Sequence, residues 1–164
     1  MNLNINDNED VEEDTQKEKY LTFVLDNQSY GIGINNVTEI IGIQPITSIP
    51  ELPDYIKGII NLRGKIIPVM DVRLRFKKVF REYNDRTCII VVDINNLSIG
   101  LIVDSVSEVL IIPDQDIVSP PNLNKVSNKY ISGIGKIDNQ VKLILDCDKL
   151  INYDDMDNLN NIEQ

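Results

Sequence analysis

Short apolar segments, most of them too short for a helix, recur along almost the whole chain. They are rich in Ile and Val and are separated by Asn, Asp, Gly or Pro, which favour turns. This pattern predicts ten strands, at 20–25, 29–34, 38–43, 59–62, 66–72, 88–94, 97–103, 107–112, 131–136 and 141–146. Helix is expected only in short pieces at 52–57, 72–77 and 148–153, with Asp148 as a cap for the last. The sequence therefore predicts an all-β protein.

Four of the connections between these strands have the composition of tight turns. Asp26-Asn27, Asn95-Asn96 and Asp138-Asn139 each join two neighbouring strands, which predicts hairpins. Asn61-Leu62-Arg63-Gly64 does the same, and it holds an arginine near the apex of a turn. The planar fork of an arginine suits carboxylates or carbonyls of a partner protein, although a solvated surface charge is the simpler interpretation.

The two halves of the body share a pattern. Residues 31–40 match residues 100–109 in their glycine, apolar and glutamate positions, at an offset of 69. Farther along, Gly58-Ile59 precedes Asp71 by the same interval of 13 residues by which Gly133-Ile134 precedes Asp146. The order of the two matches favours a duplication over chance similarity between Ile-rich strands. We therefore expect two intertwined five-stranded units, roughly 20–85 and 86–151.

Five strands joined by short turns close most simply into a small barrel, because closure removes exposed sheet edges. Two such barrels in a pseudo-twofold arrangement would bring equivalent segments together around an apolar groove. Residues Val37, Ile40, Leu62 and Val106 could line such a groove and receive an amphipathic helix of a partner. Core packing is the competing explanation for each of these aliphatic side chains.

The net charge of -10 is concentrated at the two ends of the chain. Residues 1–19 carry a net charge of -5 and residues 152–164 a net charge of -4, so both are expected to be disordered acidic tails. The body lacks a positive field, which argues against nucleic acid as a partner. Its one basic cluster predicts a solvated face or a site for an acidic protein, and consists of Arg73, Arg75, Lys77, Lys78 and Arg81.

The usual signs of catalysis are missing from the sequence. The chain has no histidine, and the glycines at 31–33 and 133–135 lack the third glycine and the helix of a phosphate-binding loop. Strand-end carboxylates such as Asp93, Asp104 and Glu108 are expected to be solvated. We therefore expect neither an enzyme nor a cofactor nor a metal site.

The cysteines and the hydropathy pattern bear on the compartment. Cys88 and Cys147 lie in separate apolar runs, which predicts buried thiols without a disulfide in a reducing environment. The sequence has no run of 18 apolar residues and no signal-peptide pattern at its start. These features predict a cytoplasmic protein without membrane insertion.

The sequence between about 20 and 151 closely resembles the CheW family, the coupling proteins of bacterial chemotaxis. The resemblance rests on the motifs PELPDYIKG at 50–58, NLRG at 61–64, PVMDVR at 68–73, VTEI at 37–40 and YISGIG at 130–135. It implies two SH3-like five-stranded barrels and an adaptor that links methyl-accepting chemotaxis receptors to the histidine kinase CheA. The acidic segment at 1–19 lies outside the family pattern.

The resemblance also implies two sets of contact residues. The receptor-binding set is Val37, Glu39, Ile40, Gly58, Asn61, Leu62, Arg63 and Val106. The kinase-binding set, at the outer ends of the barrels, is Ile43, Ile46 and Leu123. The adaptor would be cytoplasmic and recruited to membrane-associated receptor arrays. The main alternative is a duplicated small-barrel module that binds an unrelated peptide or oligosaccharide.

Overall fold

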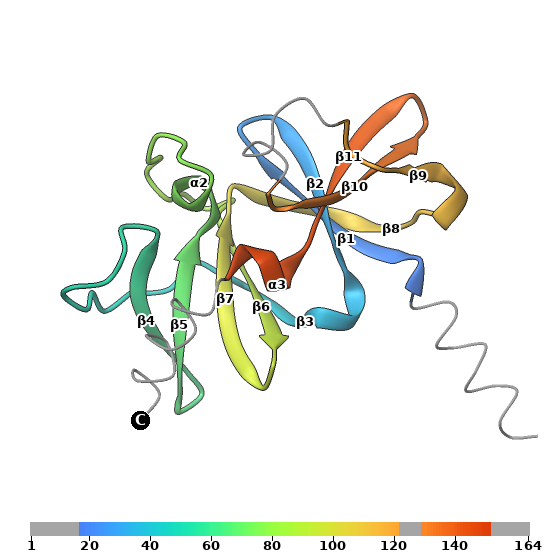
Figure 1. Cartoon of the computed structure of the whole chain (residues 1–164). Coiled ribbons are helices and arrows are strands. Elements are labelled where there is room, and N and C mark those ends of the chain that lie inside the picture. The colour runs from blue at the N-terminus through green and yellow to red at the C-terminus, as the bar shows by residue number, and fades with distance from the viewer. Residues whose placement is uncertain (1–16, 122–128, 152–164) are drawn as a thin grey trace, which may run out of the picture.

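The computed structural model describes residues 17–121 and 129–151, which form two β-sheets and two short helices (Figure 1). The six-stranded sheet has the order β8-β1-β2-β11-β10-β9 and consists of β8 (Ser105–Ile111), β1 (Lys19–Leu25), β2 (Gln28–Gly33), β11 (Gln140–Leu145), β10 (Ile131–Ile137) and β9 (Ile117–Val118). The five-stranded sheet has the order β3-β6-β7-β5-β4 and consists of β3 (Val37–Gly42), β6 (Cys88–Ile94), β7 (Leu97–Val103), β5 (Lys65–Asp71) and β4 (Ile56–Leu62). The prediction of an all-β fold is confirmed.

Each of the ten predicted strands is present, with ends shifted by three residues at most. The short β9 was not predicted, because two residues carry no periodic signal. Two of the three expected helices are present as single turns, α2 (Val72–Arg75) and α3 (Cys147–Leu150). The prediction for 52–57 is wrong, since Ile56 already begins β4 and pairs with Met70. The prediction of Asp148 as the cap of α3 is also wrong, because the N-cap residue is Asp146.

The caps of the two helices are equivalent aspartates at the ends of β5 and β11. Asp71 accepts a hydrogen bond from the Leu74 amide at 3.3 Å, and Asp146 accepts one from the Asp148 amide at 3.0 Å. A carboxylate at this position satisfies amide groups that have no partner within the helix.

The tight turns have the left-handed backbone that two-residue hairpins require. Positive φ angles occur at both residues of each turn, 54° and 63° at Asp26 and Asn27, 51° and 65° at Asn95 and Asn96, and 48° and 60° at Asp138 and Asn139. Asn and Asp tolerate this conformation better than most residues, which explains their use here. The hairpins predicted at these three turns are confirmed.

The sequence repeat is visible in the strand order. The orders β8-β1-β2-β11-β10 and β3-β6-β7-β5-β4 become identical when β1–β5 are matched with β6, β7, β8, β10 and β11. The register is repeated as well: Val69 lies opposite Gly100 in a parallel pair, and Ile144 lies opposite Gly31 in the other. These pairs are related by the offsets of 75 and 69 found in the sequence.

The sheets do not follow the two halves of the chain. Each half gives its first hairpin to the sheet of the other: β1–β2 joins β8, β10 and β11, and β6–β7 joins β3, β4 and β5. The expected division into units 20–85 and 86–151 therefore describes the repeat but not the two sheets. The reason is that β2 pairs in parallel with β11, and β5 pairs in parallel with β7. Each of these pairs joins a strand of the first half of the chain to a strand of the second half.

In each sheet the chain leaves one edge strand and returns to the opposite side of the same sheet. After edge strand β3 the chain returns to β4, where Thr47 and Ile59 exchange two backbone hydrogen bonds of 2.9 Å. After edge strand β8 the chain returns as β9, where Val118 lies opposite Ile134 of β10. This is the connectivity of a small barrel.

The larger hydrophobic cluster contains residues of both sheets and of α3, including Phe23, Val92 and Leu150, so the two sheets share one core. A smaller cluster belongs to the five-stranded sheet alone and includes Ile60, Ile89 and Ile102. Strands β6 and β7 are buried on both faces, which explains their nearly continuous apolar sequences.

Candidate functional site

The β4–β5 turn presents Arg63 on the surface. Arg63 and Gly64 have φ angles of 52° and 88°, and the Asn61 side chain accepts a hydrogen bond of 2.8 Å from the Gly64 amide. The Asn61 side chain therefore stabilises the turn, while the Arg63 side chain remains 71% exposed. This exposure agrees with the expectation that a partner can reach Arg63.

Arg63 forms an ion pair with Glu39 of β3, through its Nη2 atom and the Glu39 Oε2 atom. Both residues belong to the predicted receptor-binding set, but no local sequence signal indicates that they contact each other. Strands β3 and β4 are the two edges of the five-stranded sheet, so the ion pair connects one edge strand with the turn that follows the other. A guanidinium and a carboxylate thus lie side by side on one exposed surface.

The other predicted receptor contacts differ in exposure. Ile40 is 44% exposed, whereas Val37 is half-buried against the larger core cluster. Val106 of β8 lies in the other sheet and is also half-buried against that cluster. Val37 and Val106 are equivalent positions of the repeat.

Two members of the same predicted set are buried. Leu62 belongs to the smaller core cluster. A Cβ atom at Gly58, whose φ is 143°, would collide with the backbone of Thr47. These two residues can influence a docking surface only by shaping β4. Buried and outward positions alternate along this strand, and this alternation predicts that Leu62 is buried and Asn61 exposed.

Of the predicted kinase contacts, Ile43 and Ile46 are partly buried against the smaller core cluster. Leu123 lies outside the described residues. The arrangement of the kinase contacts therefore stays a prediction.

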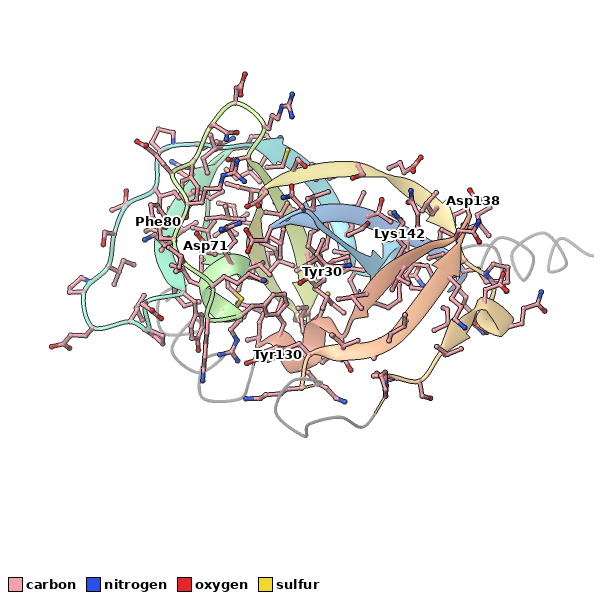
Figure 2. All side chains as sticks on the ribbon, turned by 90° about the horizontal axis from the view of Figure 1, so that it is seen from above. Tyr30, Asp71, Phe80, Tyr130, Asp138 and Lys142 are labelled. Atoms are coloured by element: carbon pink, nitrogen blue, oxygen red, sulfur yellow. The ribbon has the colours of Figure 1, made fainter. Side chains whose placement is uncertain are left out.

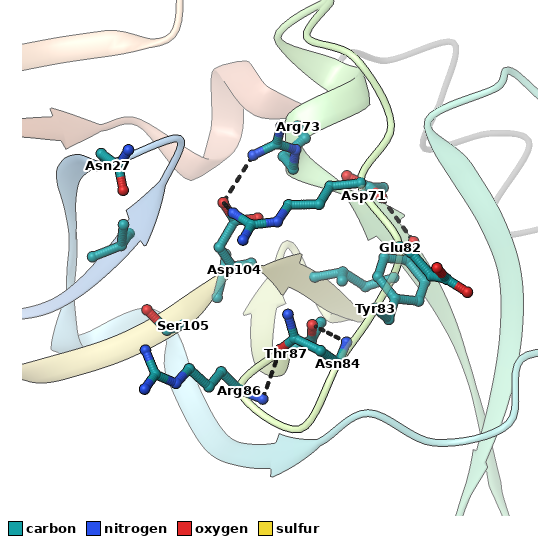
Figure 3. A pocket seen from close by; sticks show the side chains of 14 residues that line it. Asn27, Asp71, Arg73, Glu82, Tyr83, Asn84, Arg86, Thr87, Asp104 and Ser105 are labelled. Atoms are coloured by element: carbon teal, nitrogen blue, oxygen red, sulfur yellow. Dashed lines mark hydrogen bonds and ion pairs between the residues drawn. The ribbon is translucent and has the colours of Figure 1, made fainter.

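A network of charged side chains joins the two sheets, and sequence reasoning missed it. Figure 3 shows its contact between Arg73 and Asp104. Arg73 Nη1 lies 2.8 Å from Asp104 Oδ2 and 3.2 Å from Asp26 Oδ1. Arg81 and Lys78 lie 3.7 Å and 3.6 Å from Asp104 and Asp26, respectively. The network borders a polar cavity of about 220 Å³. No local sequence signal could have found it, because its members come from segments far apart in the chain.

The structure corrects two expectations about charged residues. Arg73 and Arg75 are not part of a solvated face, since only 8% and 9% of their surface is exposed. Asp104 is not a solvated strand-end carboxylate, because it accepts hydrogen bonds from Arg73 and from the Asp26 amide at 3.0 Å. These groups hold the β1–β2 turn, α2 and the β7–β8 junction together.

Tyr83 and Asp71 form a second polar contact beside this cavity. The Tyr83 hydroxyl donates a hydrogen bond of 2.7 Å to Asp71 Oδ2 (Figure 3). Burial, and then this bond to a carboxylate, raise the pKa of Tyr83 above its ordinary value. Asp71 thus caps α2 and anchors the segment after it.

Within ranges 17–121 and 129–151, no three His, Cys, Asp or Glu side chains are grouped so that they could hold a metal ion. None of the helices described there is long and apolar enough to cross a membrane. What the surface around Arg63 can offer chemically is a charged and apolar contact area for another protein.

Comparisons with known proteins agree with one another. The sequence model of the CheW-like domain family matches residues 19–155. The chain is 33% identical over 150 residues to the chemotaxis protein CheW of Klebsiella aerogenes, covering 91% of this chain and 90% of that protein. It is 32% identical over 135 residues to the chemotaxis protein CheW of Bacillus subtilis, covering 82% of this chain and 86% of that protein.

The fold is also similar to a solved structure. The crystal structure of the scaffolding protein TtCheW from Thermoanaerobacter tengcongensis superposes with a TM-score of 0.78 at 38% identity, covering 85% of this chain and 95% of that one. Proteins of this family are scaffolding adaptors of chemotaxis and not enzymes. The alternative of an unrelated peptide- or oligosaccharide-binding module is not favoured. The chain belongs to the CheW family and is a non-enzymatic chemotaxis adaptor.

Proposed function

We propose that this chain couples methyl-accepting chemotaxis receptors to the regulatory domain of the histidine kinase CheA. The observation that carries the proposal is the exposed ion pair between Arg63 of the β4–β5 turn and Glu39 of β3, a strand whose next residue, Ile40, is also exposed. Such a surface offers both charges and an apolar contact, as a protein interface requires. In this role the chain works in the cytoplasm, at receptor arrays on the membrane.

The receptor is proposed to dock its helical hairpin on this surface. Apolar side chains of the hairpin contact Ile40 and the partly exposed Val37 and Val106, while polar groups at the rim replace one partner of the Arg63–Glu39 ion pair. The exchange is inexpensive, since an exposed ion pair contributes only about 0 to 1 kcal/mol. Asn61 supports the turn that carries Arg63.

The kinase is proposed to bind elsewhere, through surfaces that include Ile43 and Ile46 at one end and Leu123 at the other. Separate surfaces would allow one adaptor to hold the receptor and the kinase simultaneously. This assignment predicts that Leu123→Glu impairs kinase binding and leaves receptor binding intact, with the reverse result for Arg63→Ala.

A reconstitution with purified components tests the proposal. The full chain is mixed with a receptor cytoplasmic hairpin fragment, with CheA, and with both, and complexes are separated by size-exclusion chromatography. We expect binary complexes with each partner and a ternary complex with both. If the chain forms a complex with neither partner, the proposed function is wrong.

A further inference from the structure

An aromatic groove lies between the two sheets, on a surface separate from the Arg63 turn. Its floor is a row of rings, with centroid distances of 5.6 Å from Tyr30 to Phe76 and 5.5 Å from Phe76 to Tyr130. The Arg75 guanidinium lies between two tyrosines, 4.4 Å from the ring of Tyr55 and 5.1 Å from that of Tyr130. Figure 2 shows Tyr30 and Tyr130 on neighbouring parts of the fold near the short helices. The groove is open and has a volume of about 920 Å³.

The rim of this groove is positively charged in a protein that is otherwise acidic. Four cations line it, Arg75, Lys77, Lys78 and Lys129, against one carboxylate, that of Asp54. Of the four, Arg75 is nearly buried and Lys78 also lies 3.6 Å from Asp26. Lys77 and Lys129 are exposed. Rings and cations together suit a segment that carries both carboxylates and apolar side chains.

The described chain ends beside this groove. Arg75 Nε donates a hydrogen bond of 2.7 Å to the carbonyl oxygen of Leu150, and Ile151 is the last described residue. The thirteen residues that follow, 152–164, have no Lys or Arg and hold four acids together with four larger apolar residues, namely Asp154, Asp155, Asp157 and Glu163 with Tyr153, Met156, Leu159 and Ile162. An extended segment of this length reaches about 40 Å.

We propose that residues 152–164 bind in the aromatic groove of their own chain. The carboxylates of the segment would face the lysines at the rim, and its apolar side chains would cover the tyrosine rings. Attachment next to the groove raises the effective concentration of the segment, so even weak contacts suffice. The segment at 1–16 is also acidic, but the chain enters the fold at β1, on the far side of the six-stranded sheet from α2 (Figure 1).

A spin label on the full chain tests this proposal. A nitroxide is attached at Asn158→Cys in a Cys88→Ser background, and backbone amide signals are followed by NMR. The remaining Cys147 is 4% exposed, and burial raises the pKa of its thiol to about 12, so labelling at neutral pH favours the introduced cysteine. We expect the amide signals of Phe76, Lys77 and Tyr130 to lose more than half of their intensity at low salt.

Charge variants and salt separate docking from random proximity. The loss of signal should disappear in Lys77→Glu/Lys129→Glu, and at 1 M salt, where the Debye length is about 3 Å. It should persist in the matched control Lys136→Glu, an exposed lysine of β10 outside the groove. Signal loss that neither salt nor the groove variants change would overturn the proposal, as would the absence of loss at the groove.

A mixing experiment distinguishes docking within one chain from docking between two copies of the chain. A spin-labelled chain at natural isotope abundance is mixed with a ¹⁵N-labelled chain that carries no nitroxide, and only the second chain is observed. Docking within one chain leaves the observed signals unchanged. Loss of groove signals in this mixture would assign the contact to a second copy and overturn the proposal.

Discussion

Arg63 and Glu39 form an ion pair that joins the two edge strands of the five-stranded sheet. The repeat places Asp138 at the position of Arg63 and Glu108 at that of Glu39. Two acidic residues cannot form this pair, so the duplicated fold carries the arginine turn on one sheet only. This asymmetry supports the proposal that the receptor approaches from the side of the five-stranded sheet.

Arg63→Ala should weaken binding of a receptor hairpin fragment and leave the fold intact. The loss of a charged hydrogen bond at an interface costs about 1 to 3 kcal/mol, or roughly 5- to 150-fold in Kd. The ion pair itself is exposed and contributes only about 0 to 1 kcal/mol to folding, so Tm should change by less than about 5 °C. Titration calorimetry and thermal unfolding measure the two effects.

Asp138→Ala is the matched control, because it removes the side chain at the equivalent turn of the second repeat. It should leave receptor binding unchanged and cost about 1 kcal/mol of stability at most, because the φ of 48° at Asp138 suits aspartate better than alanine. A large fall in Tm for Arg63→Ala would identify Arg63 as a structural residue, and equal binding losses for the two variants would argue against a special role of the arginine turn.

The strands could be predicted because their local signals are strong. Alternation and turn residues placed ten strands, and the hairpins at Asp26, Asn95 and Asp138 depend on two-residue signals alone. Which hairpins are exchanged between the intertwined repeats could not be predicted. Since β1–β2 and β6–β7 are equivalent, either one fits beside β5 by sequence pattern, and only packing of the whole chain decides between them.

The candidate site was predictable to a smaller degree. Turn chemistry indicated that Arg63 is exposed, but its partner Glu39 lies 24 residues away and has no local signal. The burial of Leu62 follows from strand alternation, which places it on the same face as Ile60. The contact between Arg73 and Asp104 depends on the tertiary fold, and charge patterning alone made both residues appear solvated.

Asp104→Ala should destabilise the protein, because Arg73 is nearly buried and would lose its shorter carboxylate contact. We expect a loss of about 2 kcal/mol in the free energy of unfolding, since Asp26 remains as a second partner of Arg73. Urea unfolding measures this loss. The control is Asp85→Ala, at an exposed position, which should have little effect. Equal stability of the two variants would mean that the network is not structural.

Gly100→Ala should destabilise the five-stranded sheet. A Cβ atom at this position would lie 2.6 Å from Ile89 Cγ2 and 2.9 Å from Val69 Cγ1, both in the smaller core cluster. Overpacking of this kind costs about 1 to 3 kcal/mol. At the equivalent Gly31 the nearest atom is the flexible Ile144 Cδ1 at 3.2 Å, so Gly31→Ala should cost less. Chemical denaturation of both variants checks the order, and the reverse order would contradict it.

The stability of the protein should fall as the pH rises above about 9, partly because of Cys147. Burial, and then the carboxylates of Asp146 and Asp148, raise the pKa of this thiol from an ordinary value of 9.0 to about 12. Below pH 9 the thiol is protonated in both the folded and the unfolded chain, so its contribution is fully present. Between pH 9 and 12 only the unfolded chain loses this proton, which favours unfolding. Urea unfolding from pH 7 to 11 should show a smaller alkaline decline for Cys147→Ala than for the unchanged chain, even though the variant starts from a lower stability. Parallel curves for the two proteins would show that Cys147 does not contribute to the decline.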